Sequence, residues 1–393
     1  RYRWVVLVVA TVAQAATAFV FLGVGALAGF LQEAFSLSGA QTGLIVTAAG
    51  AMPLFALMPV GRLLDRFGER AIVAAGALLL AAGTGAAAFA PSYPVLLLLL
   101  LVGGIGYATS QPGGSKAVAG WFTARQRGLA MGIRQTGLPL GGALAAAVLP
   151  ALAALSGWRP ALATAAGATA AGGLAFALLY RSWGGGGGEE SYGLVTEVRR
   201  LLAEPRMRPV LWAGLAQVSA QFCIISYLML FLRDVHGIPL VRGAWFLFTA
   251  QLLGVAGRVV LASLSDRMAA GLRLRPVTVS LVAAATSAAL LPLLPPGTSQ
   301  SIIFLLAAVL GFFAFGWYGP WVVHVAEVAP TGMVGLTLGL SMTANQLGIV
   351  AAPPLFGLIL DLTGSYGPAW WAIAVLLLVA ATRLVSAARR GLA

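Results

Sequence analysis

The chain has 393 residues, of which 60% are apolar and only 9% are charged. A soluble globular protein carries about a quarter charged residues, so this composition excludes a chain that is soluble on its own. The net charge of +13 would suit a nucleic-acid-binding protein, but the basic residues lie in short segments between long apolar runs. We therefore expect no nucleic acid as a partner.

The apolar runs predict an all-α membrane protein. A helix that crosses the hydrocarbon layer needs about 20 mostly apolar residues. Breakers such as Pro91, Gly157, Pro205 and Pro330 divide the chain into segments of about this length. The predicted transmembrane helices, in chain order, are 4–31, 41–64, 70–91, 93–120, 125–155, 159–182, 208–232, 239–265, 274–294, 300–326, 331–361 and 367–388.

A glycine pattern indicates that the twelve helices form two similar bundles. The pattern consists of Gly104, Gly128, Gly132, Gly141 and Gly157, which recur 207 residues later as Gly311, Gly335, Gly339, Gly348 and Gly364. Such an internal repeat is typical of transporters. We expect six helices in 1–182 and six in 208–393, joined by a cytoplasmic linker at 183–207 that contains five consecutive glycines.

The positions of the basic residues predict the orientation. With a cytoplasmic N-terminus, nineteen of the 24 Lys and Arg residues fall on the cytoplasmic side, whereas Arg159, Arg233 and Arg242 fall on the other side. Because cytoplasmic loops are enriched in basic residues, we expect a multi-pass protein of the cytoplasmic membrane with both termini in the cytoplasm.

The segment after the second helix carries a family motif. It reads Gly61-Arg-Leu-Leu-Asp65-Arg66-Phe-Gly68-Glu-Arg70. This resembles the signature of the major facilitator superfamily, and a degraded copy ends in Asp266-Arg267 in the second half. The resemblance implies a transporter that works by alternating access, with the motif residues latching the outward-open state. The positions that take this role are Gly61, Asp65, Arg66, Gly68, Arg70, Asp266 and Arg267.

A second motif lies in the eighth helix. Gly257-Arg258 is followed by Ser265-Asp266. This pattern is similar to that of monocarboxylate and oxalate/formate transporters, although other branches of the superfamily share it. The resemblance implies that Arg258 binds a substrate carboxylate.

Two arginines, Arg134 and Arg258, lie within apolar helices, and no Asp or Glu lies in the middle of any predicted helix. A cation at membrane depth costs several kcal/mol unless a partner or a water-filled cavity receives it. The absence of protein carboxylates favours an anionic substrate, a small carboxylate or related organic anion. The alternative is that both side chains reach toward the headgroups or pair with helix ends.

Other polar residues in the predicted helices are candidates for lining a substrate path, because unpaired polar atoms should avoid lipid. Each can equally serve as a hydrogen bond between helices. The candidate binding residues, besides the two arginines, are Gln14, Tyr107, Gln111, Tyr227, Trp317, Tyr318, Asn345 and Gln346; Gln135, Gln221 and Gln251 belong to the same group.

The absence of a membrane carboxylate leaves His324 as the candidate proton carrier, since histidine titrates near neutral pH. A packed, non-titrating histidine is an equal alternative, and facilitated diffusion or anion exchange would need no such group. Protons are thus a possible second cargo.

Other functions remain open. The sequence contains neither a metal-ligand spacing nor a phosphate-binding loop, so we expect no enzyme, cofactor or metal site. A transporter or drug exporter for neutral or cationic solutes is an alternative, as is a receptor that has lost transport. We expect the chain to be a monomer in the lipid bilayer.

Overall fold

The computed structural model describes residues 2–182, 199, 201, 203–268, 274–330 and 333–390. All regular structure among these residues is helical, and the helices make twelve crossings that are long and apolar enough to span a membrane. The all-α prediction with twelve transmembrane helices is therefore confirmed. The predicted linker at 183–207 lies largely outside the described residues.

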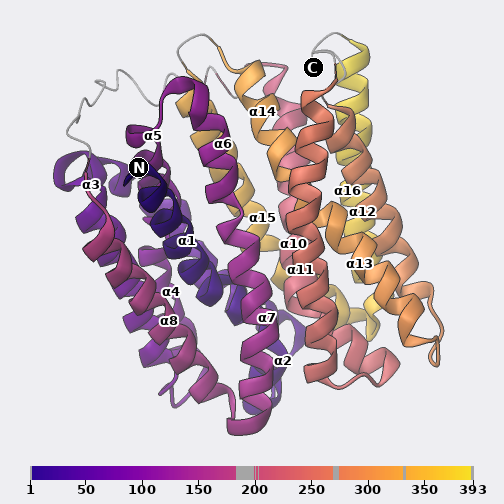
Figure 1. Cartoon of the computed structure of the whole chain (residues 1–393). Coiled ribbons are helices and arrows are strands. Elements are labelled where there is room, and N and C mark those ends of the chain that lie inside the picture. Colours follow the sequence, from indigo (N-terminus) through magenta and orange to yellow (C-terminus); the bar gives the residue numbers. More distant parts are fainter. Residues whose placement is uncertain are drawn as a thin grey trace.

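The helices form two bundles that stand side by side (Figure 1). The first bundle contains α1 (Tyr2–Ala26), α2 (Ala28–Phe35), α3 (Gly39–Ala87), α4 (Tyr93–Tyr107), α5 (Ser110–Trp121), α6 (Ala124–Gln135), α7 (Gly137–Ser156) and α8 (Trp158–Leu179). The second contains α10 (Met207–His236), α11 (Leu240–Asp266), α12 (Arg275–Leu290), a 3-10 turn (Leu291–Leu293), α13 (Gln300–Gly316), α14 (Tyr318–Val328), α15 (Val334–Thr363) and α16 (Tyr366–Arg389).

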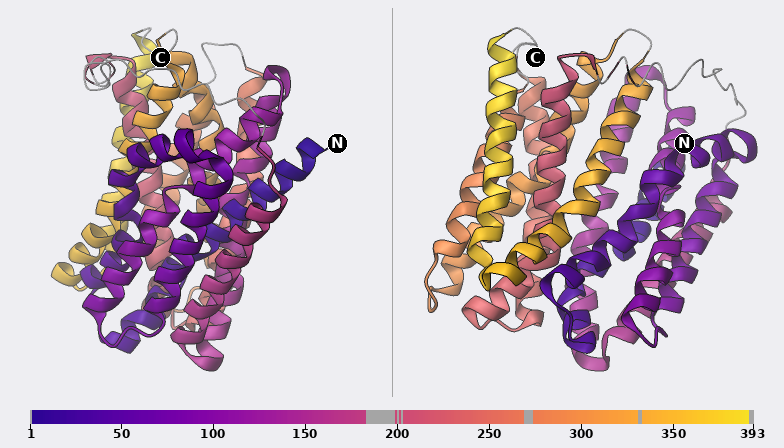
Figure 2. Two further views of the ribbon diagram at one scale, coloured as in Figure 1. Left: turned by 90° about the vertical axis from the view of Figure 1, so that its left-hand side faces the viewer. Right: turned by 180° about the vertical axis from the view of Figure 1, so that it is seen from behind.

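Both chain termini lie at the same end of the molecule, as Figure 2 shows from two further sides. We call this the terminal end and the opposite one, where α2 lies, the far end. Large apolar side chains such as Phe89 and Leu155 are more than 80% exposed on the outside of the bundles. Such a surface is stable in lipid and not in water.

Three crossings are interrupted in their interior, and a proline explains each interruption. The regular helix breaks at Thr109, Thr136 and Trp317, each three residues before a proline. The prolines are Pro112, Pro139 and Pro320. A proline ring clashes with the carbonyl four residues earlier and offers that carbonyl no N–H. Each break therefore leaves one backbone carbonyl without its helical partner.

The second and third crossings meet at Gly68 without an intervening loop. The helix α3 continues through both crossings and changes direction at this residue, where φ is +77°. An L-residue with a side chain rarely adopts this angle, so a glycine is favoured here. The sequence predicted separate helices ending at 64 and beginning at 70, and the kink falls between them.

Candidate functional site

A cavity of about 120 Å³ lies between the two bundles, and both bundles contribute to its wall. Seven of the ten predicted binding residues line it. They are Tyr107, Gln111, Arg258, Trp317, Tyr318, Asn345 and Gln346. The remainder of the wall is Phe21, Pro53, Leu57, Ala108, Leu138, Val218, Gln221, Phe222, Met342 and Ile349. The sequence predicted the polar part, whereas the apolar part has no sequence signal that separates it from residues facing lipid.

Arg258 is held at the cavity by two backbone carbonyls. Its Nε donates to the oxygen of Phe315 at 3.1 Å, and its Nη1 donates across the interface to the oxygen of Gln135 at 3.1 Å. The Gln135 carbonyl is the one that Pro139 deprives of its helical partner. Nη2 has no hydrogen-bond partner within the described part of the chain. The edge of the guanidinium at Nη2 thus remains free for a ligand.

Arg134 is fully buried but does not line the cavity. Its Nη2 donates to the carbonyl oxygens of Ser110 and Gln111 at 2.8 and 3.1 Å, and its Nη1 donates to Ser115 Oγ at 3.0 Å. The Gln111 side chain accepts from the same Nη1 at 3.4 Å. Helix α5 therefore receives this guanidinium, and no carboxylate pairs with either buried arginine among the described residues.

Aromatic rings form part of the cavity wall. The Phe21 and Tyr107 rings stack with their centres 4.0 Å apart, and Phe222 lies 5.4 Å from Phe21. The guanidinium of Arg258 lies 5.1 Å from the centre of the Tyr318 ring. A cation above a ring face is stabilised there, which adds to the two backbone bonds in fixing the arginine.

Three predicted site residues lie elsewhere. Gln14 donates to Gln135 Oε1 at 3.2 Å and Tyr227 lies at the far end of the interface. His324 is buried in α14 outside the cavity wall, with its Nδ1 3.9 Å from a carboxylate oxygen of Glu327. A helical pattern cannot distinguish these positions from cavity positions, because both are enclosed by other helices.

At the far end the two bundles touch through backbone. A Cβ added to Gly43 would lie 2.4 Å from the carbonyl carbon of Pro353, and one added to Gly357 would overlap the carbonyl of Gly39. The Tyr227 hydroxyl lies 2.8 Å from the carbonyl oxygens of both Gly39 and Pro353. Only glycine allows helices α3 and α15 to approach so closely.

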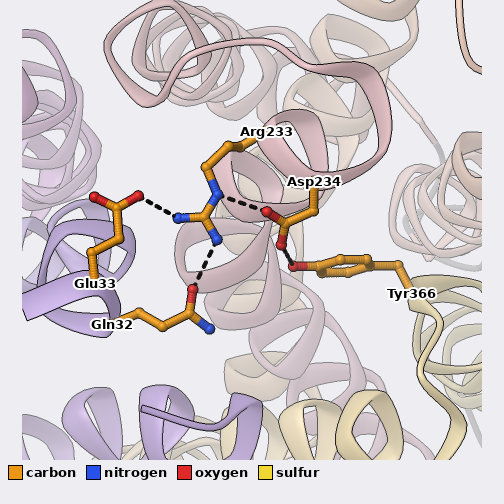
Figure 3. Close-up of polar contacts among 5 residues, drawn as sticks. All are labelled: Gln32, Glu33, Arg233, Asp234 and Tyr366. Atoms are coloured by element: carbon orange, nitrogen blue, oxygen red, sulfur yellow. Dashed lines mark hydrogen bonds and ion pairs between the residues drawn. The ribbon is translucent and has the colours of Figure 1, made fainter. Parts of the chain in front are cut away.

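Charged groups also link the two bundles at the far end. Arg233 of α10 reaches into the first bundle, where its Nη1 donates to Glu33 at 2.7 Å and its Nη2 donates to Gln32 at 3.0 Å (Figure 3). Its Nε donates to the adjacent Asp234, which also accepts from the Tyr366 hydroxyl at 2.6 Å. We call these five residues the far-end cluster.

The far end has a second polar link. The backbone N–H groups of Gly39 and Ala40, at the start of α3, donate to the Asp361 carboxylate at 2.6 and 2.8 Å. The negative charge lies at the positive end of the helix dipole, which stabilises the contact. Nearer the cavity, Gln346 donates to the Gly50 oxygen at 2.6 Å. The cavity is thus closed toward the far end.

The predicted latch residues at the terminal end make their contacts within the first bundle. Asp65 accepts from Lys116 Nζ at 2.6 Å, and Arg70 donates to the oxygen of Ala177 at 2.5 Å. The guanidinium of Arg66 lies 5.1 Å from the Phe67 ring.

Among the described residues, the other latch positions also make no contact that joins the two bundles. A Cβ on Gly61 would meet nothing within 4 Å, so no helix among the described residues packs closely against this glycine. Asp266 and Arg267 are exposed and have no partner among the described residues. Between described residues, no hydrogen bond or ion pair joins the bundles on the terminal side of Arg258.

Comparison with known proteins decides the family. The model of the Major Facilitator Superfamily matches residues 7–353. The chain belongs to this superfamily. An uncharacterized MFS-type transporter of Mycobacterium tuberculosis is 31% identical over 94% of this chain and 81% of its own length. Two further relatives are a probable sulfoacetate transporter of Cupriavidus necator (25% identical, 86% of this chain, 83% of its own) and the 3-(3-hydroxy-phenyl)propionate transporter of Escherichia coli (28%, 87% and 84%).

The fold of this superfamily member is also found among solved structures. A bacterial homolog of the human lysosomal transporter Spinster, described as inward-facing and occupied, superposes with a TM-score of 0.81. The alignment covers 99% of this chain and 97% of the other at 18% identity. The two pseudo-symmetric six-helix bundles predicted from the sequence are therefore confirmed as the fold of a transporter superfamily.

Proposed function

We propose that this protein is a secondary transporter that moves a small organic anion across the cytoplasmic membrane by alternating access. The observation that carries the proposal is the free edge of Arg258 in a cavity between the two bundles. The Nη2 group at this edge is suited to a carboxylate or sulfonate oxygen, because a charged donor forms strong hydrogen bonds with an anionic acceptor.

The charge balance supports an anion over a neutral or cationic solute. Arg134 and Arg258 both lie close to the cavity level, and no carboxylate pairs with either among the described residues. An entering cation would meet two buried positive charges at low dielectric, which is unfavourable. An entering anion would supply the missing counter-charge.

The wall of the cavity suggests what the rest of the substrate is like. Only one guanidinium edge is free, and most of the remaining wall is aromatic or aliphatic, including the stacked pair Phe21 and Tyr107. We infer a substrate with one acidic group and a compact, largely apolar body. Of the relatives, the one named for 3-(3-hydroxy-phenyl)propionate carries by its name an acid of this kind, whereas sulfoacetate has two acidic groups.

The orientation proposed from the basic residues places the terminal end in the cytoplasm. The conformation, closed at the far end, would then expose the cavity inward. The latch residues would join the two bundles in the opposite, outward-open state. We propose residues 1–182 and 208–393 as the two moving units. His324 as a proton carrier stays a prediction from the sequence.

The test is uptake of radiolabelled small organic acids into liposomes that contain only this protein. We expect Arg258→Gln to lower uptake about 10- to 100-fold, the worth of a charge-assisted hydrogen bond. Arg258→Lys keeps the charge but loses the planar fork, so its uptake should be intermediate. Arg275→Gln, which removes an exposed arginine outside both the cavity wall and the family motif, is the matched control.

Normal uptake by Arg258→Gln would overturn the anion proposal and favour a neutral or cationic solute. No flux of any solute by the folded wild-type protein, together with specific binding, would favour a receptor.

A further inference from the structure

A basic hollow of about 420 Å³ lies at the terminal end, between the start of α10 and the end of α16. Its wall contains three arginines, Arg208, Arg383 and Arg390, together with Trp212 and the hydroxyl groups of Thr382 and Ser386. It is separate from the cavity between the bundles, with which it shares no residue. Nothing in the transport proposal uses it.

The three arginines of the basic hollow have no anionic partner. None of them forms an ion pair among the described residues, and Glu204, the nearest acidic residue in the sequence, does not pair with them. Arginines that line one hollow repel one another unless an anion lies among them. The three positive charges therefore lack a counter-charge, and they are complementary to an anion that accepts several hydrogen bonds, such as a phosphate.

Two further features favour an anion at this place. Helix α10 begins at Met207 without a side-chain cap, so the positive end of its dipole adds to the arginine charges. The Arg383 guanidinium lies 5.0 Å from the centre of the Trp212 ring, which holds it in place.

The surroundings of the hollow fit a lipid. It lies where two membrane-spanning helices end, which is the depth of the headgroups. Trp212 is 38% exposed, as expected of an aromatic residue at the membrane interface. Along α16, Val375 and Val379 are exposed on the side of the helix that continues to Thr382 and Ser386. This apolar strip can receive an acyl chain below the phosphate.

We propose that the basic hollow binds the phosphate of an anionic phospholipid, with one acyl chain lying along α16. Basic pockets between transmembrane helices are known to hold such headgroups. The proposed lipid site does not depend on which side of the membrane the terminal end faces, and it does not depend on the transported substrate.

The experiment is native mass spectrometry of the purified full chain titrated with phosphatidylglycerol. The double variant Arg208→Gln/Arg383→Gln should bind it about 30-fold more weakly, at roughly fivefold for each arginine. The control Arg62→Gln/Arg275→Gln loses the same charge from exposed positions at the same end and should bind like the wild type. Arg208→Lys/Arg383→Lys keeps the charge and should retain most of the affinity.

If the double glutamine variant does not fold, the single variants Arg208→Gln and Arg383→Gln keep the test decisive, because each should bind about fivefold more weakly than the wild type. Equal binding by the glutamine variant and its control would overturn the proposal. Phosphatidylcholine binding as tightly as phosphatidylglycerol would also overturn it, because the charge would then be irrelevant. Glycerol phosphate or inorganic phosphate binding as tightly as the lipid would assign the hollow to a soluble anion instead.

Discussion

The two ends of the interface between the bundles are built differently. At the far end, glycines bring helix backbones into contact and the far-end cluster joins the bundles through Arg233. At the terminal end, the charged residues of the family motif pair within the first bundle, as Asp65 does with Lys116. The far-end contacts therefore join the two bundles, whereas the described motif residues at the other end make their hydrogen bonds within their own bundle.

This difference indicates whether ion pairs or close backbone packing closes the far end. Glu33 is 57% exposed and Arg233 is 26% exposed. Ion pairs in water contribute about 0.2–1 kcal/mol. The backbone contacts at Gly43 and Gly357 leave no room for a side chain. Steric repulsion rises with decreasing distance far more steeply than the energy of an exposed ion pair. We infer that the glycines determine whether the bundles can close and that the charges tune how often they do.

The largest effect is expected from Gly43→Ala. The new methyl group would overlap the Pro353 backbone, which cannot move aside as a flexible side chain can. At about 1–3 kcal/mol for overpacking, the conformation closed at the far end should lose about 5- to 150-fold in population. The measurement is the labelling rate of a cysteine at Met342, in the cavity wall, by a thiol reagent added at the terminal end, in a Cys223→Ala background.

The matched control is Gly167→Ala, because a Cβ at that position meets nothing within 4 Å. It should label at the wild-type rate. If Gly43→Ala also does so, the glycine contact does not govern closure.

A smaller effect is expected from Arg233→Gln, which removes the ion pairs with Glu33 and Asp234. The labelling rate from the terminal end should fall about two- to fivefold, and high salt should lower the wild-type rate in the same direction. The exchange Arg233→Glu with Glu33→Arg should restore part of it. The control is Arg242→Gln, which removes an exposed arginine at the same end. An equal fall of the labelling rate in that variant would show that the far-end cluster has no specific role in closure.

The smallest effect on labelling is expected from Asp65→Asn. Its partner Lys116 belongs to the same bundle, so the population with the far end closed should change by less than about twofold. Turnover in liposomes should nevertheless slow, because the proposed latch would act in the opposite conformation. Unchanged turnover would count against the latch, and a large change in labelling would contradict the contact within one bundle.

The sequence predicted the crossings well, and it named several residues that line the cavity, for identifiable reasons. Helix ends follow from local breakers, and the placement of Arg258 in the cavity wall agrees with its family motif. Arg134 had the same sequence signal, a cation in an apolar helix, but its guanidinium donates hydrogen bonds to backbone carbonyls of α5. Tyr227 lies at the far end, where its hydroxyl contacts the Gly39 carbonyl. The sequence does not reveal this, because a buried hydroxyl gives the same pattern whether it contacts a ligand or a backbone carbonyl.

By itself, the amino-acid sequence determined that the chain crosses a membrane twelve times and belongs to a transporter superfamily, because hydropathy and the family motif act over short stretches of chain. Only the tertiary structure decided which end of the interface is closed and which arginine keeps a free edge. Those outcomes depend on pairs such as Gly43 with Pro353 and Arg258 with Gln135, which lie more than 100 residues apart and meet only when the two bundles pack.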